Sequence, residues 1–335
     1  MTMIAATSLA SASSTSPAEN AGFNTDIAFT SNGQDIFLVN ATSNVAQEIN
    51  SHTGATVRVL GAKAYDFNFP LDLAVSGQDA FVLNYGALTN FVTEFNTVTG
   101  KLVRVLGAKS FGFVTPFDVA ISGQDAFVTN LGGHTVTEFN IVTGALVRVL
   151  DAKSYRIANP YGIAISGQDA FVANGGNSTV TEFNIVTGAL VRVLDAKSYG
   201  FSGPDGIAIS GQDAFVASPG LKGAGAITEF NIVTGSLVRV IDPRALDSLH
   251  PVFLAIEGRV GVSIDAARKV VEFNTSTGAL IRELKSTKYG FNRYTTGILT
   301  RGRDAFILNP TNQSITVIDV ATGRLVRILH FKYAH

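Results

Sequence analysis

Three aspartates recur at equal intervals in the first third of the chain, and their type and spacing suit the binding of a cation. Asp26, Asp72 and Asp118 follow one another at intervals of 46 residues. Each precedes a short apolar or β-branched run of the kind that forms a strand. Carboxylate oxygens at the ends of adjacent strands can bind Ca²⁺ or Mg²⁺. The simpler alternative is that each aspartate caps its own turn, and the sequence leaves both interpretations open.

Histidines are the second group that could carry chemistry. Of five histidines in the chain, four map to loops expected on the same side of the fold as the aspartates. A histidine beside an acidic group can act as a general base near neutral pH. His250, in the divergent segment 242–251, and His134 are therefore the candidate catalytic residues. Neither recurs at a fixed place in the repeat described below, so a catalytic role requires proximity that only the fold can supply.

A third group of polar and aromatic residues is suited to binding a small molecule, a glycan or a protein by charge and stacking. A lysine and an aromatic residue occur two positions apart in successive linkers, and two loops are longer than their counterparts. The candidate ligand-binding residues are Tyr85, Asn90, Lys153, Tyr155, Lys197, Tyr199, Asp205 and Lys222. Because the lysine–aromatic pairs recur, packing within the linkers is the competing interpretation.

The elements that must position these residues belong to one repeat that fills most of the chain. A Gly-Gln or Gly-Arg step recurs every 44 to 47 residues, at Gly33, Gly77, Gly123, Gly167, Gly211, Gly258 and Gly302. A period in this range, without helical periodicity inside it, is typical of a propeller blade. The sequence therefore predicts an all-β fold, a seven-bladed β-propeller of four-stranded antiparallel blades.

The fourth unit, residues 160–199, illustrates the predicted blade. Three strands are expected at 162–166, 169–174 and 179–184, and a fourth at 189–194, because each run is β-branched or alternates polar and apolar residues. Gly167 and Gly188 supply the turns, and Asn184 is expected to bind the backbone of the second turn as an Asx-turn. Strand order places the linkers and the loops between the second and third strands on one side, which we call the top face.

Charged residues also repeat in the two outer strands. Every unit has an arginine in its last strand, and six units have a glutamate in the third. Cross-strand or inter-blade pairing between the two sets is expected. The glutamates are Glu48, Glu94, Glu138, Glu182, Glu229 and Glu272, and the arginines of the same units are Arg58, Arg104, Arg148, Arg192, Arg239 and Arg282.

The two ends of the chain suggest how the ring closes. Residues 1–21 are rich in Ala, Ser and Thr and are interpreted as a disordered tail or a remnant export signal. Residues 22–335 form the propeller. The last residues, 331–335, followed by residues 21–24 resemble one complete linker, so the termini are predicted to meet at one inter-blade linker with no exchanged strand.

Composition excludes several classes of function. The formal net charge of −1 offers no basic surface for nucleic acid. The chain has no cysteine, which excludes disulfides, thiolate metal sites and cysteine nucleophiles. No stretch approaches the roughly 20 apolar residues of a membrane span.

The segment PYGIAISGQDAFVANGGNSTVTEFNIVTGALVRVL, residues 160–194, resembles the NHL/YVTN group of β-propeller repeats. The resemblance covers residues 22–335 and implies the fold rather than one activity, because such propellers include binding modules, surface proteins and lyase or lactonase enzymes. Since no catalytic motif is found, the sequence favours a non-enzymatic binding module that uses its top face, with an extracellular or cell-surface location slightly favoured. The alternative is a lactonase-like, metal-assisted lyase or hydrolase, with Ca²⁺ or Mg²⁺ held by the three aspartates at the mouth of the central channel.

Overall fold

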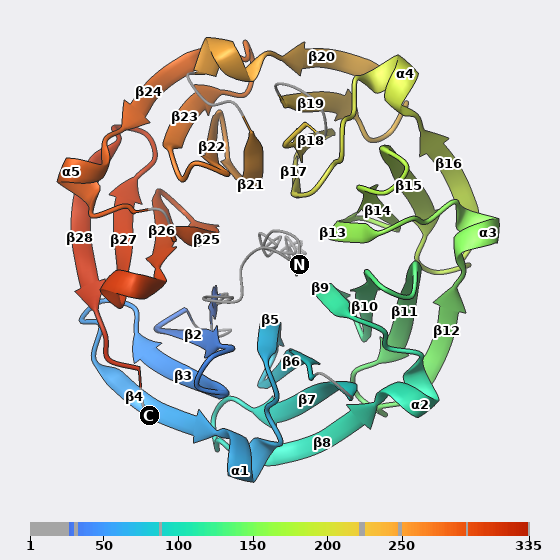
Figure 1. Ribbon diagram of the computed structural model, residues 1–335, viewed down its shortest axis with the longest axis vertical. Coiled ribbons are helices and arrows are strands. Elements are labelled where there is room, and N and C mark those ends of the chain that lie inside the picture. Colours follow the sequence, from blue (N-terminus) through green and yellow to red (C-terminus); the bar gives the residue numbers. More distant parts are fainter. Residues whose placement is uncertain are drawn as a thin grey trace, which may run out of the picture.

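Seven antiparallel sheets surround a central axis, and each sheet runs from an innermost strand near the axis to an outermost strand at the rim (Figure 1). The computed structural model describes residues 27–29, 33–86, 89–220, 225–246, 250–292 and 294–333. Each sheet consists of four strands in the order of the sequence. The predicted seven-bladed propeller is therefore confirmed.

The strand bounds follow the repeat closely. Blades 1 to 4 contain β1 (Ile27–Phe29), β2 (Asp35–Asn40), β3 (Val45–Asn50) and β4 (Thr56–Gly61); β5 (Pro70–Ser76), β6 (Asp79–Tyr85), β7 (Asn90–Asn96) and β8 (Leu102–Gly107); β9 (Pro116–Ser122), β10 (Asp125–Asn130), β11 (Thr135–Asn140) and β12 (Leu146–Leu150); β13 (Pro160–Ser166), β14 (Asp169–Asn174), β15 (Thr179–Asn184) and β16 (Leu190–Leu194). Blades 5 to 7 contain β17 (Ile207–Ser210), β18 (Asp213–Ser218), β19 (Ala226–Asn231) and β20 (Leu237–Ile241); β21 (Pro251–Glu257), β22 (Val260–Asp265), β23 (Val270–Asn274) and β24 (Leu280–Leu284); β25 (Thr296–Arg301), β26 (Asp304–Asn309), β27 (Ser314–Asp319) and β28 (Arg324–His330).

The turns of blade 4 form as their residues predict. Gly167 and Gly188 have φ of +60° and +74°, a conformation that glycine adopts without the clash a Cβ would cause. The Asn184 Oδ1 atom accepts hydrogen bonds from the backbone N–H groups of Val186 and Thr187, at 3.2 and 2.9 Å. This Asx-turn fixes the register of the two outer strands, in which Glu182 lies opposite Arg192.

The linkers contain short helices that the sequence analysis did not expect. Five one-turn helices follow outermost strands: α1 (Ala62–Tyr65), α2 (Ala108–Phe111), α3 (Ala152–Tyr155), α4 (Ala196–Tyr199) and α5 (Ser286–Tyr289). Two 3₁₀ turns are η1 (Pro243–Leu246) and η2 (Pro310–Asn312). A helix of four residues is too short to produce a 3.6-residue pattern, so it left no periodic signal.

Aromatic residues pack neighbouring blades together. Phe171 of β14 and Phe230 of β19 lie 5.9 Å apart between ring centroids, and the same pairing joins Phe127 to Phe183 at 6.0 Å. Alanines in the innermost strands, such as Ala164, are buried where the sheets converge. The core is therefore divided into clusters between blades, as expected when each blade buries both faces against its neighbours.

The Arg–Glu pairs predicted at the rim are confirmed in all six blades that contain both residues. Their separations include 2.8 Å between the Arg104 Nε and Glu94 Oε2 atoms and 2.6 Å for Arg192 and Glu182; the other pairs are Arg58–Glu48, Arg148–Glu138, Arg239–Glu229 and Arg282–Glu272. The glutamates are buried. Burial raises the pKa of Glu138 to about 7, although Arg148 acts in the opposite direction.

Blades 1 and 7 meet through the same kinds of contact as other neighbours. A shared apolar cluster includes Ile27, Leu38 and Phe331. Arg327 donates from Nη2 to the Ser51 carbonyl at 3.1 Å, and the Tyr333 N–H donates to Gln313 Oε1 at 3.1 Å. Each of the two sheets is built from four consecutive strands. Residues 21–26 lie outside the described residues, so the meeting of the termini at one linker stays a prediction.

Candidate functional site

Two of the three predicted metal-binding aspartates join neighbouring blades. Asp72 and Asp118 begin the innermost strands of blades 2 and 3 and are 2% and 1% exposed. The Asp72 Oδ2 atom accepts from the Val119 N–H at 2.8 Å, and its Oδ1 atom accepts from the adjacent Leu73 N–H. Asp118 Oδ2 likewise accepts from the Ile163 N–H of blade 4 at 2.8 Å. Each carboxylate therefore links its own strand to the next blade.

The third aspartate, Asp26, lies outside the described residues. Within residues 27–333, as far as they are described, no three His, Asp or Glu side chains are grouped closely enough to hold a metal ion. Asp72 and Asp118 do not by themselves form such a group, because a cation of this kind takes at least six oxygen ligands. The metal site formed with Asp26 stays a prediction.

Asp205 differs from these two aspartates in its hydrogen bonding. It precedes β17 of blade 5 and is 5% exposed, yet its Oδ1 atom has no hydrogen-bond partner in the described structure. Burial raises the pKa of Asp205 well above its usual value, and the negative charge of Asp118 raises it further, whereas Arg268 lowers it. Asp205 therefore presents a buried acceptor between an acidic and a basic neighbour.

Tyr161 and Arg268 complete this group, which we call the channel mouth (Asp118, Tyr161, Asp205 and Arg268). The Tyr161 pKa is raised by burial and by the charge of Asp205. Arg268 lies with its guanidinium carbon 5.7 Å from the centre of the Phe253 ring. Burial lowers the Arg268 pKa, and Asp265 and Asp205 oppose that shift. Asp118 and Tyr161 belong to β9 and β13, two of the innermost strands that surround the central axis (Figure 1).

Arg268 stands where other blades have a hydrogen-bond acceptor. A residue at the end of the loop before the third strand has positive φ in several blades, at Asn44, His134, Ser178, Arg268 and Gln313. Four of these accept a hydrogen bond from a backbone N–H of the following linker: Asn44 from Phe69, His134 from Asn159, Ser178 from Gly203 and Gln313 from Tyr333. A guanidinium has no acceptor atom. Arg268 cannot make this bond and instead interacts with Asp205 and Asp265.

The two candidate catalytic histidines each contact a neighbouring blade. His134 Nδ1 accepts from the Asn159 N–H at 2.9 Å, which is the linker bond just described. His250 Nδ1 lies 2.5 Å from the Pro219 carbonyl oxygen of blade 5, so Nδ1 carries the proton in that bond. Each histidine therefore has a structural role in holding its segment against a neighbour. A catalytic role for His134 or His250 stays a prediction.

The lysine–aromatic pairs have one packed and one exposed member. The hydroxyls of Tyr155 and Tyr199 donate to the carbonyls of Gly188 and Gly235 in the turn of the following blade. Lys153 and Lys197 are exposed. The tyrosines therefore hold adjacent blades together, while the lysines stay available at the surface.

The remaining predicted ligand-binding residues lie in the two long loops. Tyr85 packs edge-on against Phe69, with ring centroids 6.3 Å apart, and lies opposite Asn90 in the sheet. The Asn90 Oδ1 atom is buried without a hydrogen-bond partner in the described structure. Lys222 lies outside the described residues. Of the seven predicted residues that the structure describes, only Asp205 belongs to the channel mouth.

The sequence analysis missed Arg268 and Tyr161. Tyr161 occupies a position next to Gly162 that is not distinctive in sequence. For Arg268 a signal existed: aligned with His134 and Ser178, it replaces an acceptor by a donor in the loop before the third strand. The substitution becomes informative only when the structure shows that this position binds the next linker.

Comparison with known proteins shows the fold. No family model matches the sequence, and no curated protein sequence does. Among solved structures, the chain is similar to the computationally designed Ika8 protein (TM-score 0.63, 16% identity, covering 91% of this chain and 86% of that one). It is also similar to BamB from Moraxella catarrhalis (0.60, 16%, 92% and 88%) and to hydrazine synthase from Kuenenia stuttgartiensis (0.66, 12%, 88% and 95%). At these identities the similarity concerns the fold alone.

In the part of the chain that the structure describes, no helix is long and apolar enough to span a membrane.

Proposed function

We propose that this protein is a non-enzymatic binding module of NHL/YVTN type, and that its channel mouth binds a small ligand carrying a cationic donor group such as an amine. The observation that supports the proposal is the buried Oδ1 atom of Asp205, which lacks a hydrogen-bond partner. Burying an acceptor without a partner costs free energy. Such a cost is commonly retained at sites that bind a ligand.

The charge around Asp205 favours a cationic ligand. Asp118 raises the pKa of Asp205 and Arg268 lowers it, while burial raises it most. An ammonium group placed against Asp205 would donate to Oδ1 and compensate the charge of both carboxylates. Tyr161, which is half-buried beside this group, offers an aromatic face.

Thermal unfolding in the presence of a simple amine tests the proposal. Ethanolamine should raise the melting temperature of the wild type relative to NaCl at equal ionic strength, and should not do so for Asp205→Asn. The matched control Asp66→Asn removes an exposed aspartate elsewhere in a linker and should respond like the wild type. A ligand at 100 times its Kd stabilises the folded state by about 2.7 kcal/mol. No rise with ethanolamine would contradict the proposal.

The metal-assisted lyase or hydrolase is tested in the same experiment. After EDTA treatment, Ca²⁺ or Mg²⁺ should raise the melting temperature if Asp26, Asp72 and Asp118 hold an ion. That rise should disappear in Asp72→Asn. A metal response without an amine response would favour the enzyme over the binding module.

A further inference from the structure

The arginines of the outermost strands make a second repeated contact besides their pairing with glutamate. In five blades the arginine Nη2 atom donates to a backbone carbonyl in the next blade's turn, at 3.1 to 3.3 Å. These bonds are Arg58 to Val98, Arg104 to Val142, Arg148 to Val186, Arg192 to Val233 and Arg327 to Ser51. In these blades the arginine Nη2 atom therefore has a backbone carbonyl as its hydrogen-bond acceptor.

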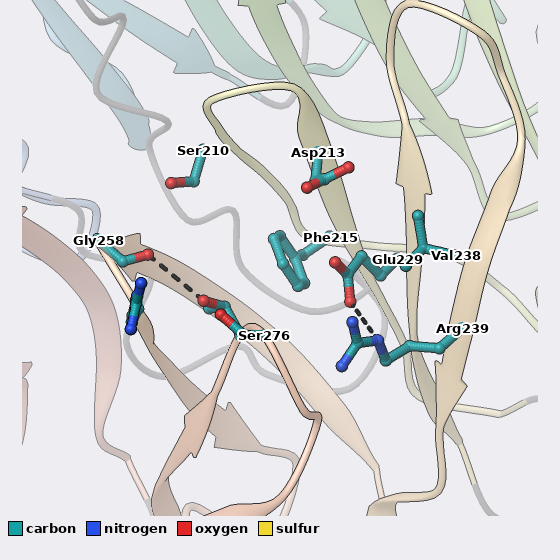
Figure 2. A pocket seen from close by; sticks show the side chains of 10 residues that line it. Ser210, Asp213, Phe215, Glu229, Val238, Arg239, Gly258 and Ser276 are labelled. Carbon is teal, nitrogen blue, oxygen red and sulfur yellow. Dashed lines mark hydrogen bonds and ion pairs between the residues drawn. The ribbon is translucent and has the colours of Figure 1, made fainter.

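Two arginines, Arg282 of blade 6 and Arg239 of blade 5, form no such bond among the described residues. The Nη1 atom of Arg282 is buried without a hydrogen-bond partner, whereas Arg239 borders a pocket. The Arg239 Nε atom pairs with Glu229 Oε2 at 2.7 Å, but its terminal nitrogens have no hydrogen-bond partner among the described residues. The pocket beside it, of about 370 Å³, lies between blades 5 and 6. Figure 2 shows the Arg239 guanidinium paired with Glu229 on one side of this space and Ser276 on the other.

Substitutions in the turn of blade 6 accompany the pocket. Where blades 3, 4 and 5 have Ile-Val in this turn, blade 6 has Thr275-Ser276. The Thr275 hydroxyl donates to the Gly258 carbonyl at 3.4 Å, and Ser276 and Arg259 also line the pocket. Smaller, polar side chains therefore border the pocket at the positions where blades 3, 4 and 5 have two apolar ones.

The unpaired groups of the pocket are mainly donors. Arg259 is exposed, and its side chain forms no ion pair or hydrogen bond within the described residues. The two carboxylates of the lining are already engaged, because Glu229 is paired with Arg239 and Asp213 accepts from Asn231 at 3.5 Å. The ligand that satisfies this set must supply acceptor oxygens.

We propose that this inter-blade pocket binds a small oxyanion, a carboxylate or phosphate group. Guanidinium groups bind such oxygens in a forked, charge-assisted geometry. Arg239 would donate from its terminal nitrogens, in place of the donation to a turn carbonyl that the arginines of blades 1 to 4 and 7 make. Arg259 adds the second cation, and the Ser276 hydroxyl adds a neutral donor. The site is separate from the channel mouth and does not depend on the function proposed for it.

Calorimetric titration with succinate and with inorganic phosphate tests this site, since the two probes distinguish carboxylate from phosphate. At least one should bind saturably, with a Kd of about 1 mM or lower. Ser276→Val introduces the valine that blades 2 to 5 have at this position and should obstruct the pocket, and Arg259→Gln removes an exposed cation. Neither change touches the Arg239–Glu229 pair, and each should weaken binding about tenfold or more, that is by about 1.4 kcal/mol.

The matched control is Val186→Ser, which makes the reverse change in the turn of blade 4, where Arg148 keeps its carbonyl partner. It should bind the probe like the wild type, and circular dichroism should confirm that all variants are folded. The proposal is overturned if neither probe binds saturably, or if both pocket variants bind as tightly as the wild type.

Discussion

Asp118 and Asp205 are both buried aspartates at the inner end of a blade, but they differ in what their carboxylates bind. Asp118 accepts a backbone N–H of the next blade at 2.8 Å, as Asp72 does. Asp205 has an oxygen without a hydrogen-bond partner in the described structure. Aspartate therefore joins neighbouring blades in blades 2 and 3, whereas in blade 5 it has an acceptor oxygen without a hydrogen-bond partner.

The contact between blades 4 and 5 uses the backbone of Asp205 rather than its side chain. In blade 4 the position equivalent to Asp118 is Gly162, whose N–H donates to the Asp205 carbonyl at 3.1 Å. A Cβ at Gly162 would lie 2.6 Å from that same oxygen, which is too close for any other side chain. Blades 4 and 5 are thus joined through the backbone, and the Asp205 side chain is not needed for that contact.

The largest expected effect is the loss of the inter-blade bond of Asp118. Asp118→Ala should lower the free energy of unfolding by about 3 kcal/mol, because it leaves the buried Ile163 N–H without its acceptor. Urea denaturation measures this change. Asp118→Asn retains an oxygen acceptor and should cost less. Equal losses in both variants would indicate that the charge of Asp118, rather than the hydrogen bond, stabilises the fold.

The opposite sign is expected at Asp205. Asp205→Asn should raise the free energy of unfolding by about 1 kcal/mol in the absence of ligand, because it removes a carboxyl that burial and Asp118 disfavour. The melting temperature should rise, while the response to ethanolamine is lost. If Asp205→Asn destabilised the protein as much as Asp118→Ala, the contrast between the two residues would be wrong.

The fold was predictable because its determinants repeat. Glycine turns, the Asx-turn of Asn184 and the Arg–Glu register occur blade after blade, so each occurrence supported the others. The channel mouth was only partly predictable, because it depends on departures from the repeat. Asp205 could be noticed because it lies one residue before Gly206, the position that aligns with Asp118. The importance of Arg268 follows from a linker bond between residues about 25 positions apart, such as His134 and Asn159. No local sequence pattern encodes such a bond.

Rim glutamates offer a third environment for a buried carboxylate, and the pH dependence of stability tests it. Burial raises the pKa of Glu94, Glu138, Glu182 and Glu272 to about 7, against 4.5 as the ordinary value. Between these two values the folded state binds more protons than the unfolded state. The stabilisation is therefore complete below pH 4.5 and is lost as the pH rises through about 7.

Urea denaturation from pH 5 to pH 8 should accordingly give a falling free energy of unfolding. Glu138→Gln, which imitates the protonated carboxyl, should flatten this slope only in part, because the pKa values of the five other rim glutamates are raised as well. The raised pKa already includes the opposing effect of the arginine partner. Stability that rose over this range would mean that ion pairing with arginine outweighs burial, and the rim glutamates would then resemble the satisfied carboxylate of Asp118 rather than that of Asp205.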